Sequence, residues 1–274
     1  MPIDRIGLCS WSLQQGNPQS LLAMVRETGL DAVQLAMTPM VLEEETWGEC
    51  VDTLASEGVG ILSGMMAPLN EDYSSLESIA RTGGLRPDET WSGNEQMARS
   101  IAGLAARHGI DLVTLHAGFM PESPEDPERS VIIDRLRLLV DVHAEVGVSV
   151  ALETGQETAT TLLEVLEEID RETLGVNFDP ANMILYGMGD PIEALQALAP
   201  HVLQLHIKDA VSTDVSGTWG SEVPVGSGEV DWPAFLAVVE SLPRTVNAVI
   251  EREAGDDRVA DIRGARVFLD GVAS

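Results

Sequence analysis

Short aliphatic runs alternate with amphipathic stretches along the whole chain. Between the runs, apolar residues recur every three or four positions, as in residues 18–29 and 158–170, which predicts helices there. The strand candidates are IGLCSW, DAVQLAM, VGILSGM, DLVTLHAG, VSVALETG, LGVNFDP, VLQLHIKD and NAVIERE. Eight strands that are each followed by a helix predict an α/β fold, a single (β/α)8 TIM barrel, rather than a doubly wound sheet.

Five successive strand candidates carry small or polar residues on one face. In VLQLHIKD, residues 202–209, the polar side chains of Gln204, His206 and Lys208 alternate with aliphatic ones. The other four runs keep this phase, and near the C-terminal end of the polar face they carry His116, Glu153, Asp179 and Glu251. Since one face of a barrel strand meets the helices and the other meets the axis, we expect these residues to converge at the barrel mouth.

No repeat, low-complexity tract or linker-like stretch divides the chain, so residues 1–274 are predicted to form one domain. Two long connections, residues 68–93 and 210–231, follow the third and seventh strand candidates. Connections that follow barrel strands lie at the mouth, where such folds place their active sites.

The chain is strongly acidic, with 45 acidic and 16 basic residues and a formal charge of −29. This charge opposes binding to nucleic acids and to anionic membranes. Cys9 and Cys50 lie far apart and form no CxxC motif, which argues against a disulfide framework and a zinc knuckle. No signal peptide and no apolar run near ~18 residues is present, so we expect a cytoplasmic protein, with homo-oligomerisation left open.

Each ionisable residue at the predicted mouth has a structural explanation when it is taken alone. Asp179 before Pro180 fits a helix N-cap, and a histidine such as His206 is often a hydrogen-bonded core residue. Jointly these explanations fail, because carboxylates that converge without an arginine on the same faces need a cation. Lys208 supplies one counter-charge and a divalent ion supplies more. Carboxylates with one imidazole suit Mn²⁺ first, and also Mg²⁺, Co²⁺ or Zn²⁺.

The motifs LETG, NFDPAN, QLHIKD and VIERE, in this order, resemble the xylose isomerase-like TIM-barrel superfamily of sugar epimerases, isomerases and inosose dehydratases. The resemblance covers nearly the whole chain and is most specific from residue 153 to residue 251. It implies one divalent metal ion held by Glu153, Asp179, His206 and Glu251. It also implies that the two glutamates are the catalytic acid and base. The turn GSGEVDW, residues 226–232, is similar to one common after the seventh strand of these proteins.

Two positions depart from the pattern of several sugar epimerases. Asn182 stands where they carry a histidine, and no arginine follows HIKD. With few basic residues near the mouth, we expect a neutral polyol, ketose or keto-glycoside rather than a phosphorylated substrate. The side chains expected to contact it are Trp11, as an apolar platform for a sugar ring, and His116, Asn182 and Lys208.

The expected activity is metal-dependent sugar isomerisation or epimerisation. A divalent ion that contacts a substrate carbonyl makes the neighbouring C–H proton acidic by stabilising the enediolate that its loss forms. One of Glu153 and Glu251 would remove this proton and the other would return one. The alternative is a lyase, a dehydratase or β-elimination enzyme acting on an inosose or a 3-keto-glycoside, in which Lys208 protonates the departing oxygen or serves only as a counter-charge. Two other classes are alternatives. An endonuclease IV-like nuclease would need more histidines at the barrel mouth than this chain offers. A sugar-binding or regulatory barrel would keep the metal ion but would catalyse no reaction.

Overall fold

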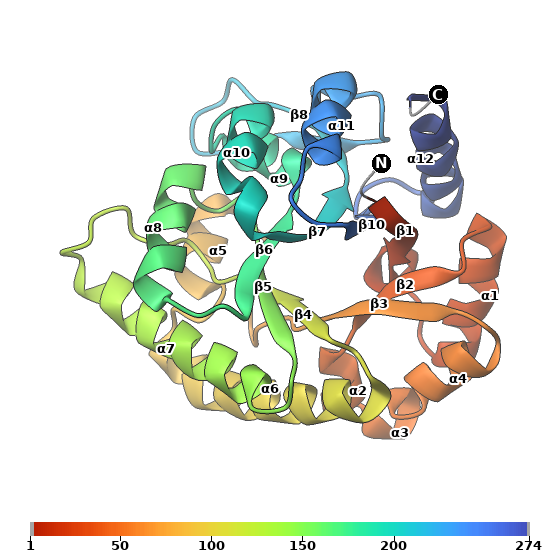
Figure 1. Cartoon of the computed structure of the whole chain (residues 1–274), viewed down its shortest axis with the longest axis horizontal. Coiled ribbons are helices and arrows are strands. Elements are labelled where there is room, and N and C mark those ends of the chain that lie inside the picture. The colour runs from red at the N-terminus through yellow and green to blue at the C-terminus, as the bar shows by residue number, and fades with distance from the viewer. Residues whose placement is uncertain (1–2, 273–274) are drawn as a thin grey trace.

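A computed structural model describes residues 3–272 of the chain. Its eight main strands close into a parallel barrel in the order β1-β10-β7-β6-β5-β4-β3-β2 (Figure 1), which confirms the predicted fold. The barrel strands are β1 (Ile3–Cys9), β2 (Ala32–Ala36), β3 (Gly60–Met65), β4 (Leu112–Leu115), β5 (Ser149–Glu153), β6 (Leu174–Phe178), β7 (Val202–Ile207) and β10 (Val246–Ile250).

Helices form the outer layer around the strands (Figure 1). The two helices predicted from periodicity are confirmed, and each begins at a side-chain cap, Asn17 for α1 and Thr158 for α8. The helices are α1 (Pro18–Thr28), α2 (Thr38–Leu42), α3 (Glu44–Trp47), α4 (Cys50–Ser56), α5 (Leu76–Thr82), α6 (Asp88–His108), α7 (Pro127–Ala144), α8 (Ala159–Ile169), α9 (Pro180–Tyr186), α10 (Pro191–Leu198), α11 (Trp232–Glu240) and α12 (Arg258–Val272), with 3-10 turns η1 (Ser10–Leu13) and η2 (Ala199–His201).

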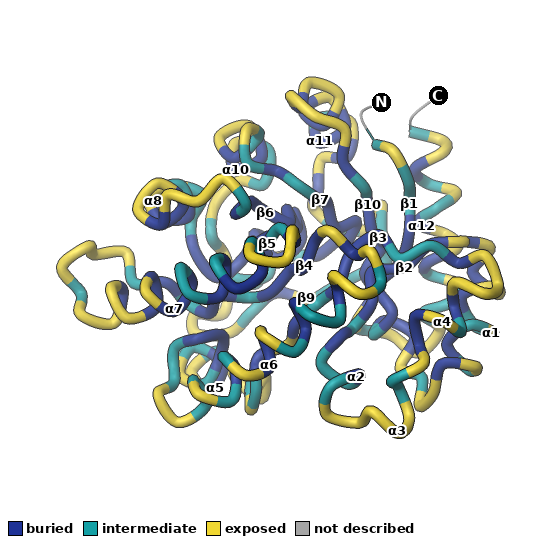
Figure 2. The backbone as a smooth tube through the Cα atoms, turned by 60° about the horizontal axis from the view of Figure 1, so that its bottom comes forward, coloured by how far each residue is buried: buried dark blue, intermediate teal, exposed yellow. Residues whose placement is uncertain are grey.

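The polar strand face points into the barrel, as the alternation predicted. The Ser63 hydroxyl of β3 donates to Gln204 Oε1 of β7 at 2.7 Å, so these side chains meet across the interior. On the other face, Phe178 of β6 packs against Phe235 of α11, with ring centroids 6.3 Å apart. Most residues of the barrel strands are buried, and exposed backbone lies at the periphery (Figure 2). Polar side chains therefore occupy the axis, and the apolar core lies between strands and helices.

Two segments differ from the sequence-based expectation. The first strand ends at Cys9, two residues early, because Ser10 and Trp11 enter the turn η1, where the Ser10 hydroxyl accepts the Ala36 N–H at 2.9 Å. The connection over residues 210–231 is not only a loop, because β8 (Asp209–Val211) and β9 (Ser221–Val223) pair there as an antiparallel hairpin. Within residues 3–272, no helix combines the length and the apolar composition that crossing a membrane requires.

Candidate metal centre and substrate cavity

Four buried side chains meet at the C-terminal ends of four barrel strands. Glu153 is the last residue of β5, Asp179 follows β6, His206 lies near the end of β7, and Glu251 follows β10. They are between 0% and 3% exposed. One ligand atom of each lies within 4.8 Å of the corresponding atoms of the others. The structure thus brings together the four residues that were predicted from the sequence to be metal ligands.

The geometry of this cluster fits a cation. His206 Nδ1 lies 3.3 Å from Glu153 Oε1, 3.5 Å from Asp179 Oδ2 and 3.6 Å from Glu251 Oε2. Neither His206 Nδ1 nor Asp179 Oδ2 has a hydrogen-bond partner among the described residues. Buried polar atoms are rarely left without partners, and three carboxylates with one imidazole are a suitable donor set for a divalent ion.

Asp179 has two separate tasks at this position. Its Oδ1 accepts the backbone N–H of Asn182 at 2.9 Å and so caps α9. Its Oδ2 remains directed at His206 Nδ1. The helix cap uses one oxygen of this carboxylate, and the other oxygen remains available for the metal-ligand role that the sequence predicts.

The ring of His206 is fixed by a residue that sequence analysis did not single out. Gln34 Oε1 lies 2.7 Å from His206 Nε2, and Gln34 Nε2 donates to Thr114 Oγ1 at 2.7 Å. The Asn177 amide nitrogen, 3.0 Å from Nε2, cannot accept a proton, so Gln34 is the acceptor of the ring N–H. Nδ1 is therefore the ring nitrogen that faces the carboxylates. Burial lowers the pKa of His206, but these carboxylates raise it well above its usual value, and a bound metal ion would take the place of the Nδ1 proton.

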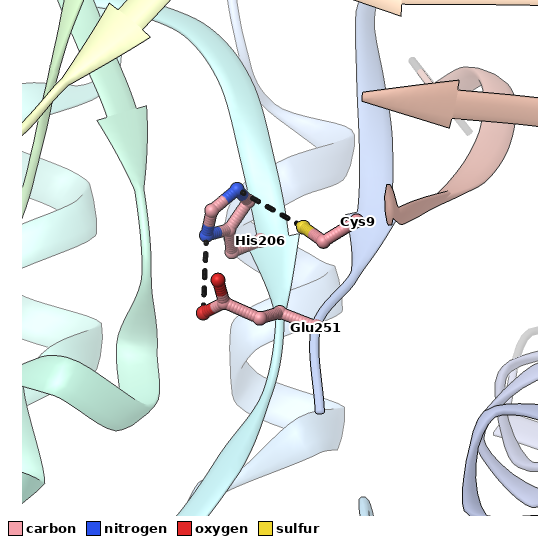
Figure 3. Close-up of side chains that lie close together, drawn as sticks. All are labelled: Cys9, His206 and Glu251. Atoms are coloured by element: carbon pink, nitrogen blue, oxygen red, sulfur yellow. Dashed lines mark hydrogen bonds and ion pairs between the residues drawn. The ribbon is translucent and has the colours of Figure 1, made fainter. Parts of the chain in front are cut away.

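Cys9 Sγ lies 3.7 Å from His206 Nε2, whereas Glu251 contacts the other ring nitrogen, Nδ1 (Figure 3). Cys9, His206 and Glu251 also satisfy the distances of a metal-binding trio. Burial raises the pKa of the Cys9 thiol, which keeps it protonated, and Nε2 already faces Gln34. Cys9 therefore packs against the histidine, and the trio is a weaker candidate than the four-residue cluster.

Charges in the cluster compensate each other strongly. Burial opposes ionisation of Glu251, yet Lys208 and His206 hold the pKa of this carboxyl well below its usual range. Burial likewise opposes the charge on Glu153, but His116 and His206 lower its pKa. Burial raises the pKa of Asp179 above its usual value, although Lys208 partly offsets this effect. At neutral pH the two glutamates are thus ionised and available for a cation.

Lys208 is the only lysine in the sequence. It is 3% exposed, and its ammonium donates to Glu251 Oε2 at 2.7 Å, to Glu253 Oε2 at 2.8 Å and to Asn182 Oδ1 at 3.3 Å. An ammonium has three N–H donors, and all three have acceptors here. The position matches a counter-charge of the cluster, which was one of its two expected roles.

The other predicted substrate residues also contact the glutamates. Trp11 Nε1 donates to Glu251 Oε1 at 2.7 Å, His116 Nε2 lies 3.5 Å from Glu153 Oε1, and Asn182 Nδ2 donates to Glu153 Oε1 at 3.0 Å. All of them, with Lys208, line one cavity of about 700 Å³, which reaches the cluster at Glu251. Trp11 was expected to be a platform for a sugar ring, and the structure adds a hydrogen bond by which it positions the Glu251 carboxylate.

Part of the remaining wall of this cavity comes from the two long connections, as their place at the mouth predicted. Tyr73 lies in the first connection, and Trp219 in the second packs edge-to-face on Tyr186 of α9, with centroids 6.4 Å apart. Acidic side chains in the same walls are Glu71, Glu222 and Glu253. Sequence analysis missed these individual residues, and only the length of the connections indicated their region.

Asp209 explains the conspicuous turn after β7. Its buried carboxylate accepts the backbone N–H of Gly226 at 2.9 Å, that of Gly228 at 3.1 Å and the indole N–H of Trp232 at 3.0 Å. A Cβ at Gly228 would lie 2.1 Å from Asp209 Oδ1, so only glycine fits there. Asp209 thus ties the second connection, and with it the hairpin wall of the cavity, to the end of β7.

Curated proteins match parts of the chain. It is 32% identical over 91 residues to the 3-dehydroshikimate dehydratase of Bacillus anthracis, which covers 32% of this chain and 32% of that protein. It is 30% identical over 109 residues to YihM of Escherichia coli K12, covering 39% of this chain and 33% of that protein. The chain therefore spans about a third of the length of these relatives.

Solved structures match nearly the whole chain. A xylose isomerase domain protein of Planctomyces limnophilus has 32% identity and a TM-score of 0.88, covering 98% of this chain and 97% of that one. The 3-keto-D-glucoside 4-epimerase YcjR of E. coli shares the fold at 18% identity and a TM-score of 0.72, covering 97% and 99%. The fold is also that of a Mycobacterium smegmatis protein solved with magnesium, at 20% identity and a TM-score of 0.71, covering 95% and 90%.

The architecture, the order of the motifs and these likenesses point to one family. The sequence model of that family, described as xylose isomerase-like TIM barrel, matches residues 22–270. The chain belongs to the xylose isomerase-like TIM-barrel family.

Proposed function

We propose that this protein is a divalent-metal-dependent sugar isomerase or epimerase that transfers a proton at a carbon beside a carbonyl. The observation that carries the proposal is the buried cluster at the cavity floor, where His206 Nδ1 and Asp179 Oδ2 lack partners among the described residues. Glu153, Asp179, His206 and Glu251 would hold the ion. Manganese is the ion we expect first, because carboxylate oxygens outnumber nitrogen in this donor set.

The bound ion would polarise the substrate carbonyl and so acidify the neighbouring C–H bond. Glu153 and Glu251 are the proposed proton-transfer groups. They lie on β5 and after β10, with β6 and β7 between them in the barrel; Glu251 lines the cavity, and Glu153 contacts the lining residues His116 and Asn182. His116 and Asn182 hold the first carboxylate, while Trp11 and Lys208 hold the second. Two fixed carboxylates on different sides of one carbon allow removal of a proton from one face and its return to the other.

The cavity favours a neutral carbohydrate. Its cationic lining groups are Lys208 and His116, and each already contacts carboxylates. The rings of Trp11, Tyr73, Tyr186 and Trp219 offer apolar surface for the C–H faces of a sugar. We further propose that residues 1–274 act as one cytoplasmic domain without a nucleic-acid partner.

A second candidate function is elimination. Lys208 lies 2.7 Å from Glu251 and can protonate an oxygen that leaves the carbon next to the enolate. In that reaction a carboxylate takes the C–H proton, the C–O bond breaks, and the oxygen departs as water or an alcohol with the new proton. The partial likeness to a 3-dehydroshikimate dehydratase is the specific reason to keep this alternative.

Proton exchange tests the proposal directly. Keto-sugars, inososes and 3-keto-glycosides are incubated with the Mn²⁺-loaded protein in D₂O and followed by NMR. Deuterium at one carbon with a new epimer or aldose supports isomerisation, whereas an unsaturated product supports elimination. The double variant Glu153→Gln/Glu251→Gln, which lacks both proposed proton-transfer groups, provides the control for contaminating activity. Absence of exchange and of product across the panel, with metal content verified, would refute both candidates.

A further inference from the structure

The cavity carries more negative charge than holding one ion requires. Glu71, Glu222, Glu251 and Glu253 line it, against Lys208 and His116. Glu251 belongs to the cluster, and Glu222 is bound by Arg252 Nη1 at 2.7 Å. Glu71 accepts the backbone N–H of Gly84 at 2.8 Å and is balanced by the charge of His116. Glu253 has none of these tasks. Its side chain is 53% exposed at the cavity wall, and its Oε2 lies 2.8 Å from the Lys208 ammonium.

Glu253 changes the sign of the site. The cluster contributes the carboxylates of Glu153, Asp179 and Glu251, which a divalent ion and the Lys208 ammonium together neutralise. Such a neutral site would leave the ammonium of Lys208 as a ready partner for a substrate carboxylate or phosphate. Glu253 occupies that ammonium and leaves the site with net negative charge.

We propose that Glu253 is a specificity-determining residue that excludes anionic substrates by covering the only lysine of the chain. Specificity often depends on a group that repels the wrong ligand, and a half-exposed carboxylate on the cavity wall is suited to that task. The accepted substrates are neutral sugars, and sugar acids and sugar phosphates are rejected. This inference rests on the proposed function only in assigning the cavity to a carbohydrate.

Glu253 argues against the anionic substrate that the name of one partial relative suggests. Dehydroshikimate is a carboxylate, and the likeness to its dehydratase covers 32% of this chain. Here no arginine lines the cavity within the described residues, and the single ammonium is saturated by Glu251, Glu253 and Asn182. The variant Glu253→Gln keeps an oxygen that can accept from Lys208 but removes the charge.

Tryptophan quenching tests the charge of the cavity without knowledge of the substrate. Trp11 and Trp219 line the cavity, so iodide as an anionic quencher is compared with acrylamide as a neutral one, at constant low ionic strength. The Glu253 carboxylate repels iodide, and in water two unit charges roughly 7 Å apart interact by about RT. Glu253→Gln removes this repulsion, so the ratio of the iodide to the acrylamide quenching constant should rise by about two- to threefold. Glu57→Gln, which removes an exposed carboxylate at the end of α4 that does not line the cavity, should leave the ratio unchanged.

Two outcomes of the quenching experiment would contradict the role of Glu253. An unchanged ratio in Glu253→Gln, or an equal rise in Glu57→Gln, would overturn the inference. Adding Lys208→Met to Glu253→Gln should cancel the rise, and a persisting rise would show that Lys208 is not the covered cation. Melting temperatures and metal content confirm that each variant is folded and loaded. If the ratio rises but no neutral sugar exchanges deuterium, only the proposed function is lost.

Discussion

Trp11 donates its indole N–H to Glu251 Oε1 at 2.7 Å, while Lys208 occupies the other oxygen of the same carboxylate at 2.7 Å. One donor comes from the turn after β1 and the other from the residue after β7. Both oxygens of Glu251 are therefore fixed from elements far apart in the sequence. This arrangement orients the carboxylate without help from its own strand.

Trp11→Phe should separate orientation from substrate stacking. The variant keeps an aromatic face and loses the N–H donor, so kcat should fall by about 10- to 100-fold, the usual cost of a hydrogen bond to a charged group. KM should change little. Steady-state kinetics on the substrate found by proton exchange measures both, with Trp219→Phe as the control on the same cavity. A raised KM with normal kcat would instead support a platform role only.

Removal of the metal ion should destabilise the protein. The proposed ion binds only the folded state, so at 100-fold excess over its Kd it stabilises by roughly 2.7 kcal/mol. Chelation should therefore lower the melting temperature in scanning calorimetry, and Mn²⁺ should restore it. The same treatment should have little effect on His206→Ala, which lacks the nitrogen ligand. Identical melting of loaded and chelated wild-type protein would contradict a resident ion.

Gln34 should control metal affinity through His206. Gln34→Leu removes the acceptor of the Nε2 proton, and loss of such a partner typically weakens metal binding by about 10- to 100-fold. Gln34→Glu restores an acceptor and should recover affinity. Competition with a fluorescent chelator measures the affinity, and ¹⁵N NMR of the imidazole reports which nitrogen bears the proton. Equal affinity of the Leu and Glu variants would show that Gln34 only fills space.

Glu153 and Glu251 should both be needed for turnover. Replacement of either by Gln should lower turnover by about 10² to 10⁴, the range of acid–base catalysis, while the fold is retained. If they serve opposite faces of one carbon, one variant should still exchange the substrate proton in D₂O without forming product. By contrast, Asp179→Asn should be partly rescued by excess Mn²⁺. Near wild-type turnover in both Gln variants would contradict the mechanism.

Glu157 should make stability depend on pH. This side chain is 8% exposed, and burial raises the pKa of its carboxyl to about 8 from an ordinary value of 4.5. The unfolded chain ionises first, so the free energy of unfolding should fall as pH rises from 4.5 to about 8, by at most roughly 1.4 kcal/mol per pH unit. Glu157→Gln should remove this contribution. Urea unfolding of both proteins at pH 5 and 8.5 measures it, and a constant difference between them would contradict the shift.

Alternation of polar and apolar residues along the strands was sufficient to predict the barrel. It also predicted that the ionisable side chains at the C-terminal strand ends lie close together. Asn177 and Gln204 point inward because period-two alternation leaves them no other face. The cavity walls were not predictable in the same way. The segment that carries Trp219 is held by the β8–β9 pairing and by the Gly220 N–H, which donates to Leu185 O at 2.9 Å, and contacts of this kind leave no periodic signal. Gln34 was missed for a related reason, since one polar residue inside an apolar run does not reveal its partner.

The single lysine also allows local opening of the barrel to be measured by proteolysis. A lysine-specific endoprotease has one cleavage site in this sequence, after Lys208, and that residue is 3% exposed. Cleavage requires local separation of the end of β7 from its neighbours, so the appearance of two fragments measures how often this part of the barrel opens. Ligands that close the cavity should slow the cut, and each ligand can thus be ranked on a gel without any knowledge of the reaction.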